Sequence, residues 1–200
     1  MNINYCFPTI FGSETLDIDT SELNKIDDFR TKIHHGTYMS GNVRILELLS
    51  LTLIKNQLTE LINTFFNKVG YRRNKFVITT SWINKIEKGG RILEHLHGNS
   101  FYSGCLYFQD DYSQATPLEY RHPNRYTRQI CPRCEDPFHS GCSWIPPVVP
   151  NLLILFPSQI IHCSDTHLGP PRKSLAFNIM PTGFVGDIGD SVYDTEWLNL

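Results

Sequence analysis

The sequence lacks the features that mark membrane-spanning, secreted and nucleic-acid-binding proteins. No stretch approaches the roughly 18 uninterrupted apolar residues that a transmembrane helix requires. The first residues carry neither a basic start nor an apolar run, which argues against a secretion signal and predicts a cytoplasmic protein. The formal net charge of −2 gives no electrostatic basis for binding nucleic acid or an anionic membrane.

Internal repeats, low-complexity tracts and a regular alternation of helix and strand patterns are also absent. A chain of 200 residues with 40% hydrophobic and 19% charged residues is long and apolar enough for one domain with its own core. We therefore expect a single domain over residues 1–200. Helical patterns come first and strand patterns follow. This order favours an antiparallel sandwich or barrel with N-terminal helices packed on one face over a parallel sheet.

Two helices are expected in the N-terminal part of the chain. The first begins at Ser21, with Thr20 or Ser21 as its cap. The second runs from Asn42, its expected cap, to about Val69. Its apolar residues recur at steps of three and four, which predicts a helix packed against a sheet. These residues are Leu58, Leu61, Ile62, Phe65, Phe66 and Val69.

Strand patterns dominate the rest of the chain. An edge strand with Pro8 inside it is expected up to about Gly12. Further strands are expected over residues 76–84, 101–108, 152–156 and 174–179, which are rich in β-branched, aromatic and other apolar residues. Residues 1–75 would then supply a strand and supporting helices, and residues 76–181 the β core.

Three histidines are the leading candidates for metal ligands. His95 and His97 are two residues apart, so on a strand both imidazoles project to one side and can reach a single ion. A third ligand has to come from elsewhere, and His162 follows an apolar strand where a histidine needs a polar partner. Imidazole ligands suit iron, zinc or copper. The alternative is that His95 and His97 lie on an exposed strand without a metal.

Arg172 and Ser174 form a second candidate site at the start of the last predicted strand. A charged residue before an apolar strand is costly unless it faces water or binds an anion. The guanidinium group can bind a carboxylate with two parallel hydrogen bonds, and Ser174 on the same face can donate another. The pair therefore predicts a carboxylate-binding site, with an unrelated surface arginine and serine as the alternative.

A cysteine-rich stretch over residues 131–142 suggests a further metal site. Cys131, Cys134, His139 and Cys142 supply thiolates and an imidazole, a ligand set that suits tetrahedral zinc. The last gap is short for such a site, so reduced cysteines without a metal are the alternative. This insertion lies between the histidine pair and His162, and we expect it to border the mouth of their site.

The combination of these motifs resembles the 2-oxoglutarate- and iron(II)-dependent oxygenases, with uncharacterised bacterial and phage proteins as the most similar group. The resemblance runs from about residue 76 to residue 181. It rests on three stretches and their order. They are residues 81–107, which contain Ser81-Trp82-Ile83-Asn84, His95-Leu96-His97-Gly98-Asn99-Ser100 and Tyr107; Leu155-Phe156-Pro157-Ser158 with His162; and Arg172-Lys173-Ser174-Leu175-Ala176-Phe177-Asn178.

The resemblance implies a double-stranded β-helix, the cupin-like jelly roll, with iron at its mouth. It implies that His95 and His162 ligate Fe(II), and that Arg172 and Ser174 bind the remote carboxylate of 2-oxoglutarate, with Tyr107 lining the same pocket. The sequence departs from the family at His97, where most members have Asp or Glu. A three-histidine set leaves the metal with one more positive charge than two histidines and a carboxylate provide.

The resulting hypothesis is a dioxygenase that hydroxylates an unknown primary substrate with 2-oxoglutarate as its small-molecule co-substrate. Two alternatives remain: a non-catalytic zinc-binding interaction module, and a cupin-type oxygenase that uses three histidines without 2-oxoglutarate. No membrane partner is expected. The sequence leaves the oligomeric state open, with a homodimer among the options.

Overall fold

The computed structural model describes residues 8–72, 74–123, 143–185 and 193–194. Its larger sheet has seven strands and its smaller sheet three. The larger sheet contains β1 (Gly12–Thr15), β2 (Phe29–His34), β3 (Thr37–Ser40), β4 (Lys75–Ile86), β5 (Tyr102–Leu106), β8 (Leu152–Pro157) and β10 (Arg172–Thr182). The smaller sheet contains β6 (Leu118–Arg121), β7 (Ser143–Trp144) and β9 (His162–Ser164), and a separate short pair is formed by β11 (Phe184–Val185) and β12 (Tyr193–Asp194).

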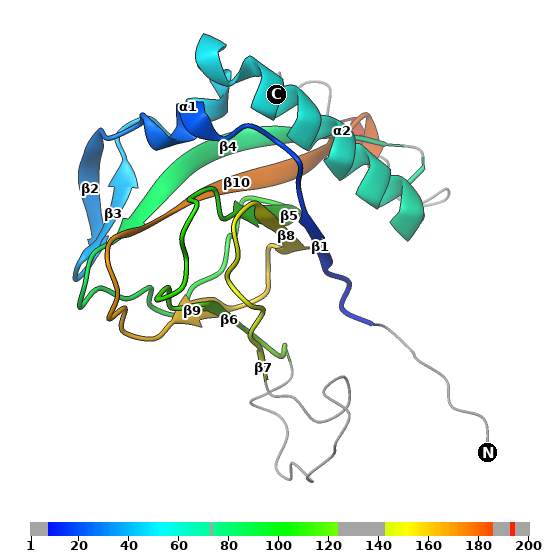
Figure 1. The fold of residues 1–200 in the computed structure, drawn as a ribbon. Helices are drawn as coiled ribbons and strands as arrows, with labels where there is room; N and C mark the ends of the chain where they lie inside the picture. The colour runs from blue at the N-terminus through cyan, green and yellow to red at the C-terminus, as the bar shows by residue number, and fades with distance from the viewer. Residues whose placement is uncertain (1–7, 73, 124–142, 186–192, 195–200) are drawn as a thin grey trace, which may run out of the picture.

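The strand order confirms a mainly β jelly roll, the double-stranded β-helix. The larger sheet runs β1-β8-β5-β10-β4-β3-β2 and the smaller one β7-β6-β9, with antiparallel pairing between all these neighbours. The smaller sheet lies across from one face of the larger, and the helices cover the opposite face (Figure 1). No helix within the described ranges is long and apolar enough to cross a membrane.

Two helices cover the outer face of the larger sheet: α1 (Ser21–Asn24) and α2 (Thr52–Val69). Thr20 occupies the N-cap position of α1, as predicted, but its side chain makes no capping hydrogen bond. The Thr20 hydroxyl instead donates to the carbonyl of Phe108 (3.0 Å). The predicted N-terminal edge strand also begins later than expected, since β1 starts at Gly12.

The long helix starts ten residues later than the prediction at Asn42. Residues 45–47 and 49–51 form two short 3₁₀ turns, separated by Leu48 in an extended conformation. The backbone N–H of Leu46 donates to the Ser81 hydroxyl of β4 (3.0 Å), so this segment is bonded to the sheet instead of continuing a helix. Tertiary contacts thus override the local helical pattern here.

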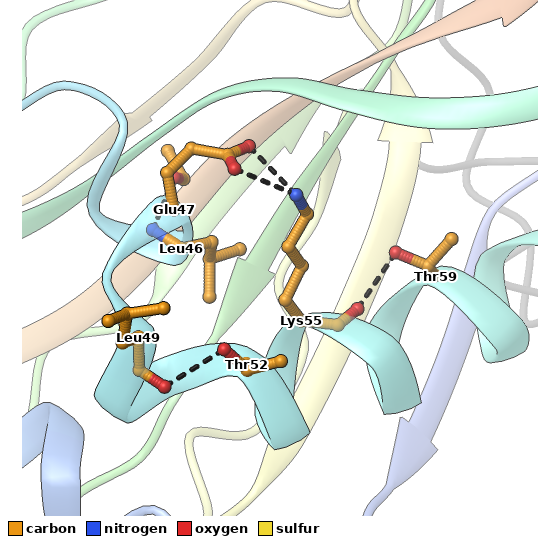
Figure 2. A network of polar contacts seen from close by, with 7 residues as sticks. Leu46, Glu47, Leu49, Thr52, Lys55 and Thr59 are labelled. Carbon is orange, nitrogen blue, oxygen red and sulfur yellow. Dashed lines mark hydrogen bonds and ion pairs between the residues drawn. The ribbon is translucent and has the colours of Figure 1, made fainter.

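Local polar contacts hold the first turns of α2 (Figure 2). The Thr52 hydroxyl donates to the carbonyl of Leu49 (2.9 Å), and Thr59 donates to the carbonyl of Lys55 (2.8 Å). Lys55 also reaches back to both carboxylate oxygens of Glu47, each at 2.9 Å. Gly70 ends the helix in a left-handed conformation (φ 111°), which glycine adopts without strain.

The larger sheet has apolar side chains on both faces. Its outer face packs against α2, in which Leu58, Ile62 and Phe66 of the predicted stripe are buried together with Ile54. Its inner face contributes to a second cluster inside the barrel, formed by Ile86, Ile92, Cys105, Tyr107, Tyr112, Leu118, Tyr120, Leu152, Ile154, Phe156 and Ile160. Gly104 lies where a Cβ atom would meet the Phe177 ring, so this strand position requires glycine.

Candidate metal centre and adjoining cavity

The three predicted histidine ligands meet at one end of the barrel. His162 is the first residue of β9 and is buried. The segment with His95 and His97 is not the regular strand that the sequence predicts, because it forms only an isolated bridge in which His95 and His162 exchange backbone hydrogen bonds (3.1 and 3.0 Å). The backbone N–H of His97 donates to the carbonyl of Ser158 (2.9 Å). These few bonds fix both histidines beside β9.

The geometry of the three imidazoles suits a shared metal ion. One ring nitrogen from each of His95, His97 and His162 lies within 4.8 Å of the others. The ring centroids are 4.2 Å apart for His95 and His162, 5.2 Å for His97 and His162, and 5.4 Å for His95 and His97. Ligand nitrogens about 2 Å from one ion lie at most about 4 Å apart, so a small closure would complete the set.

Each of the three rings has an oxygen acceptor at Nδ1. His95 Nδ1 lies 2.9 Å from the carbonyl of Leu93, and His162 Nδ1 lies 3.0 Å from the carbonyl of Ile160. A carbonyl can only accept, so it fixes the proton on Nδ1 and leaves the Nε2 lone pair for a metal. Hydrogen bonds of this kind orient histidine ligands in metal sites.

Asn178 provides the third acceptor, and sequence reasoning did not assign it a role. Its Oδ1 lies 2.6 Å from His97 Nδ1 and also accepts from the Ser103 hydroxyl (3.0 Å). Its Nδ2 donates to the Thr80 hydroxyl (3.0 Å). Asn178 is buried on β10, where a register shift relative to β4 follows it. The sequence signal was its position at the end of the Arg172–Asn178 motif.

Desolvation favours the neutral form of the three imidazoles, of which His162 is buried, His97 half-buried and His95 more exposed. Burial, together with the repulsion that charged His95 and His97 would exert, lowers the pKa of His162 to about 3. Burial also lowers the pKa values of His95 and His97, partly offset by their acceptors Leu93 and Asn178. Neutral imidazole is the form that binds a metal, so the site is ready to ligate at neutral pH.

Arg172 is buried, contrary to the surface alternative, and its guanidinium group is only partly satisfied. It is 2% exposed, and its Nη1 donates to the carbonyl of Thr116 (2.8 Å). Its guanidinium carbon lies 5.4 Å from the centroid of the Tyr107 ring. Within the described part of the chain, Nε and Nη2 have no hydrogen-bond partner. Two buried, unpaired donors on a cation are costly unless an anion binds them.

A cavity of about 390 Å³ adjoins the three histidines, while Arg172 is not among its lining residues. Ser174 lines it, and Arg172 occupies the next inward-facing position of β10, as the sequence predicted for this pair. The other lining residues come from both sheets and from the β2–β3 hairpin. They are Ile33, His34, Thr37, Met39, Trp82, Asn84, Ile92, His95, Leu96, His97, Gly98, Asn99, Gly104, Cys105, Leu118, Phe156, His162, Ala176 and Asn178.

The remaining sequence candidates fall in three places. The predicted zinc ligands Cys131, Cys134, His139 and Cys142 lie outside the described residues. Tyr107 is fully buried beside Arg172, and its phenol has no hydrogen-bond partner among the described residues. His167 is buried outside this cluster, and its Nε2 lies 2.5 Å from the carbonyl of Pro170. His34, in contrast, lines the cavity.

Comparison with known sequences gives one family. The sequence model of the family described as "Putative 2OG-Fe(II) oxygenase" matches residues 80–178, a range that contains all three histidines, Arg172 and Ser174. No curated protein matches the chain at a significant level.

Solved structures of similar fold include several 2-oxoglutarate oxygenases. An oxidoreductase of the 2OG-Fe(II) oxygenase family from Burkholderia pseudomallei is 19% identical, with 80% of this chain and 78% of that chain covered and a TM-score of 0.54. A prolyl-4-hydroxylase from Pseudomonas putida is 13% identical (85% and 92% covered, TM-score 0.60). HygX from Streptomyces hygroscopicus, solved with nickel and 2-oxoglutarate, is also 13% identical (88% and 85% covered, TM-score 0.60). At these identities the similarity shows the shared fold.

Proposed function

Because residues 80–178 of this chain belong to the 2OG-Fe(II) oxygenase family, we propose that His95, His97 and His162 hold the iron and that Arg172 and Ser174 hold 2-oxoglutarate. The reaction is the hydroxylation of a C–H bond in a primary substrate. When bound, Fe(II) and 2-oxoglutarate supply the oxidising chemistry, in which dioxygen converts the co-substrate to succinate and carbon dioxide. The protein binds, orients and shields the reactants.

The ligand set fits such a metal on its chemistry. Three neutral imidazoles bind iron, zinc, copper and nickel, and they leave coordination positions open for a co-substrate. His97 takes the position at which most of the family carries a carboxylate. The protein ligands then carry no negative charge, so 2-oxoglutarate would be the anionic ligand of the metal.

The unpaired donors of Arg172 are the observation that carries the co-substrate assignment. Nε and Nη2 are buried and have no partner among the described residues, although a guanidinium group stays charged at every physiological pH. A carboxylate accepts two parallel hydrogen bonds from such a group. Ser174 lines the cavity beside the histidines and lies two positions after Arg172 on β10, so we propose that a dicarboxylate contacts the metal at one end and Arg172 at the other.

The test is calorimetric titration of 2-oxoglutarate into anaerobic, iron-reconstituted protein. We expect binding that requires the metal, is lost in His162→Ala and weakens about 30-fold or more in Arg172→Ala, as happens when one member of a buried charge pair is removed. Arg91→Ala is the matched control, because Arg91 is an exposed cation on the segment before His95. Succinate formation, followed by NMR, should change in parallel.

Other outcomes would favour the alternatives. If the protein retains iron and consumes oxygen without binding 2-oxoglutarate, the three-histidine cupin-type oxygenase is the better assignment. Zinc without iron and no affinity for 2-oxoglutarate would favour the non-catalytic module. Equal 2-oxoglutarate affinities of Arg172→Ala and Arg91→Ala would remove Arg172 from the co-substrate site.

A further inference from the structure

The cavity beside the proposed metal ligands is lined in one direction by the β2–β3 hairpin and in the other by β5, and we infer that the direction toward the hairpin takes an uncharged, apolar group of the primary substrate. This inference rests on the proposed function, because it treats the histidines as the metal site. It adds the chemical class of the group to be oxidised and the residues that select it.

The strand order separates the two directions. In the larger sheet, β5 lies on one side of β10 and β4, and the β3–β2 hairpin lies on the other. Arg172 faces the β5 side, since its guanidinium group contacts the Tyr107 ring and the carbonyl of Thr116. The co-substrate therefore occupies that side. The hairpin side remains for a second molecule.

The side chains on the hairpin side are apolar or polar and include no acidic residue, lysine or arginine. The hairpin contributes Ile33, His34, Thr37 and Met39, β4 contributes Trp82 and Asn84, and the segment that carries His95 and His97 contributes Leu96 and Asn99. No Asp, Glu, Lys or Arg is among the described residues that line the cavity. A charged substrate group would lose its hydration here without gaining a counter-charge, whereas an apolar group loses nothing.

Two of these residues expose apolar surface beside the metal ligands. Ile33 is 40% exposed and Leu96 is 48% exposed, although both line the cavity. Trp82 lies deeper, with its ring stacked 5.7 Å from the His97 ring and its Nε1 donating to Asn84 (3.1 Å). The apolar walls thus run from the opening to the ligand His97. A group between Leu96 and Trp82 would have its C–H bonds close to the metal.

The experiment uses cobalt(II) in place of iron, with 2-oxoglutarate bound, and measures paramagnetic relaxation of small probes by proton NMR. The probes are the N-acetyl, N-methylamide derivatives of leucine, lysine and glutamate, which differ only in the side chain. We expect relaxation enhancement for the leucine side-chain protons, and little for those of lysine and glutamate.

Charge variants of the cavity sharpen the test. Leu96→Glu should lower the relaxation enhancement of the leucine probe and raise that of the lysine probe. We expect a change of about two- to fivefold, the range for a partly exposed ion pair. Leu53→Glu is the control that adds the same charge elsewhere. Leu53 is 78% exposed on α2 and does not line the cavity, so the variant should keep the wild-type order of probes.

The outcomes separate the inference from the proposed function. Failure to bind cobalt or 2-oxoglutarate, measured by cobalt absorption and calorimetry, would overturn the proposed function and the inference with it. If both bind and the lysine or glutamate probe is relaxed as strongly as the leucine probe, the inference alone is overturned. The same holds if no probe is relaxed, or if Leu53→Glu changes the order of the probes as much as Leu96→Glu.

Discussion

Asn178 of β10 orients one of the proposed metal ligands, His97. Its amide oxygen accepts from His97 Nδ1 at 2.6 Å, and its amide nitrogen donates to Thr80, so the side chain is held from two sides. The bond keeps the proton on Nδ1 and turns Nε2 toward His95 and His162. An amide provides this acceptor without adding charge, which leaves the site neutral.

We expect Asn178→Ala to weaken metal binding about 10- to 100-fold, the usual cost of removing a hydrogen bond behind a histidine ligand. Asn178→Asp keeps an acceptor and should restore most of the affinity. Asn84→Ala is the matched control, since Asn84 lines the same cavity and bonds Trp82 but no ligand. Competition with a chromophoric chelator for cobalt(II) gives the affinities, and the cobalt spectrum reports the geometry. Equal affinities for the two alanine variants would contradict a positioning role.

At the scale of elements, the apolar periodicity of α2 and the core strands is visible in the sequence. The predicted stripe from Leu58 to Val69 faces the sheet, and the strands predicted over residues 76–84 and 152–156 correspond to β4 and β8. Each of these segments is recognisable because the spacing of its own apolar residues shows which residues are buried. The ends of the strands are less predictable. β4 (Lys75–Ile86) and β10 (Arg172–Thr182) are longer than their apolar patterns because they pair with each other along their whole length.

The elements that sequence reasoning missed owe their structure to distant partners. The β2–β3 hairpin carries polar and charged residues and lacks the strict alternation of a strand, yet β3 pairs with β4 and extends the sheet. The strand β9 is three residues long and pairs with β6, forty residues earlier. The histidine ligands were found from residue type and spacing, while their irregular backbone depends on the bridge to His162.

The α2–sheet interface allows stability to be tested apart from the metal site. Phe66 is fully buried and stacks on Phe76 with ring centroids 3.7 Å apart. We expect Phe66→Ala to lower the free energy of unfolding by about 3–5 kcal/mol, measured by urea titration. On the same helix, Leu53 is 78% exposed, and Leu53→Ala should change stability by no more than about 0.5 kcal/mol. A loss below 1 kcal/mol for Phe66→Ala would mean that the helix is weakly docked.

For the molecule as a whole, the proposed metal site joins segments that are far apart in the chain. The proposed ligands come from residues 95–97 and from His162, and each segment alone offers an incomplete site. Folding brings them together without charge compensation, because all three are neutral histidines. The consequence is that the folded protein excludes protons from imidazoles that the unfolded chain would protonate in mild acid.

The metal-free protein should therefore lose stability as the pH falls below about 6.5. The pKa of His162 is about 3 in the folded protein, while an unfolded histidine titrates near 6.5. Between these values the unfolded state binds a proton that the folded state does not, so the free energy of unfolding declines by up to about 1.4 kcal/mol per pH unit for this residue. Below about pH 3 the folded site is protonated as well and the decline from this group ends.

His162→Gln removes this titration while keeping a polar side chain of similar length. Urea unfolding of the metal-free proteins at pH 7, 6, 5 and 4 should give a shallower decline for the variant, by about 1 kcal/mol per pH unit or slightly more. His95 and His97, whose pKa values are lowered in the same direction, account for part of the decline that remains. Parallel curves for wild type and His162→Gln would mean that His162 is protonated in the folded protein and accessible to water, and the metal centre would then have to form by a larger rearrangement than the observed geometry implies.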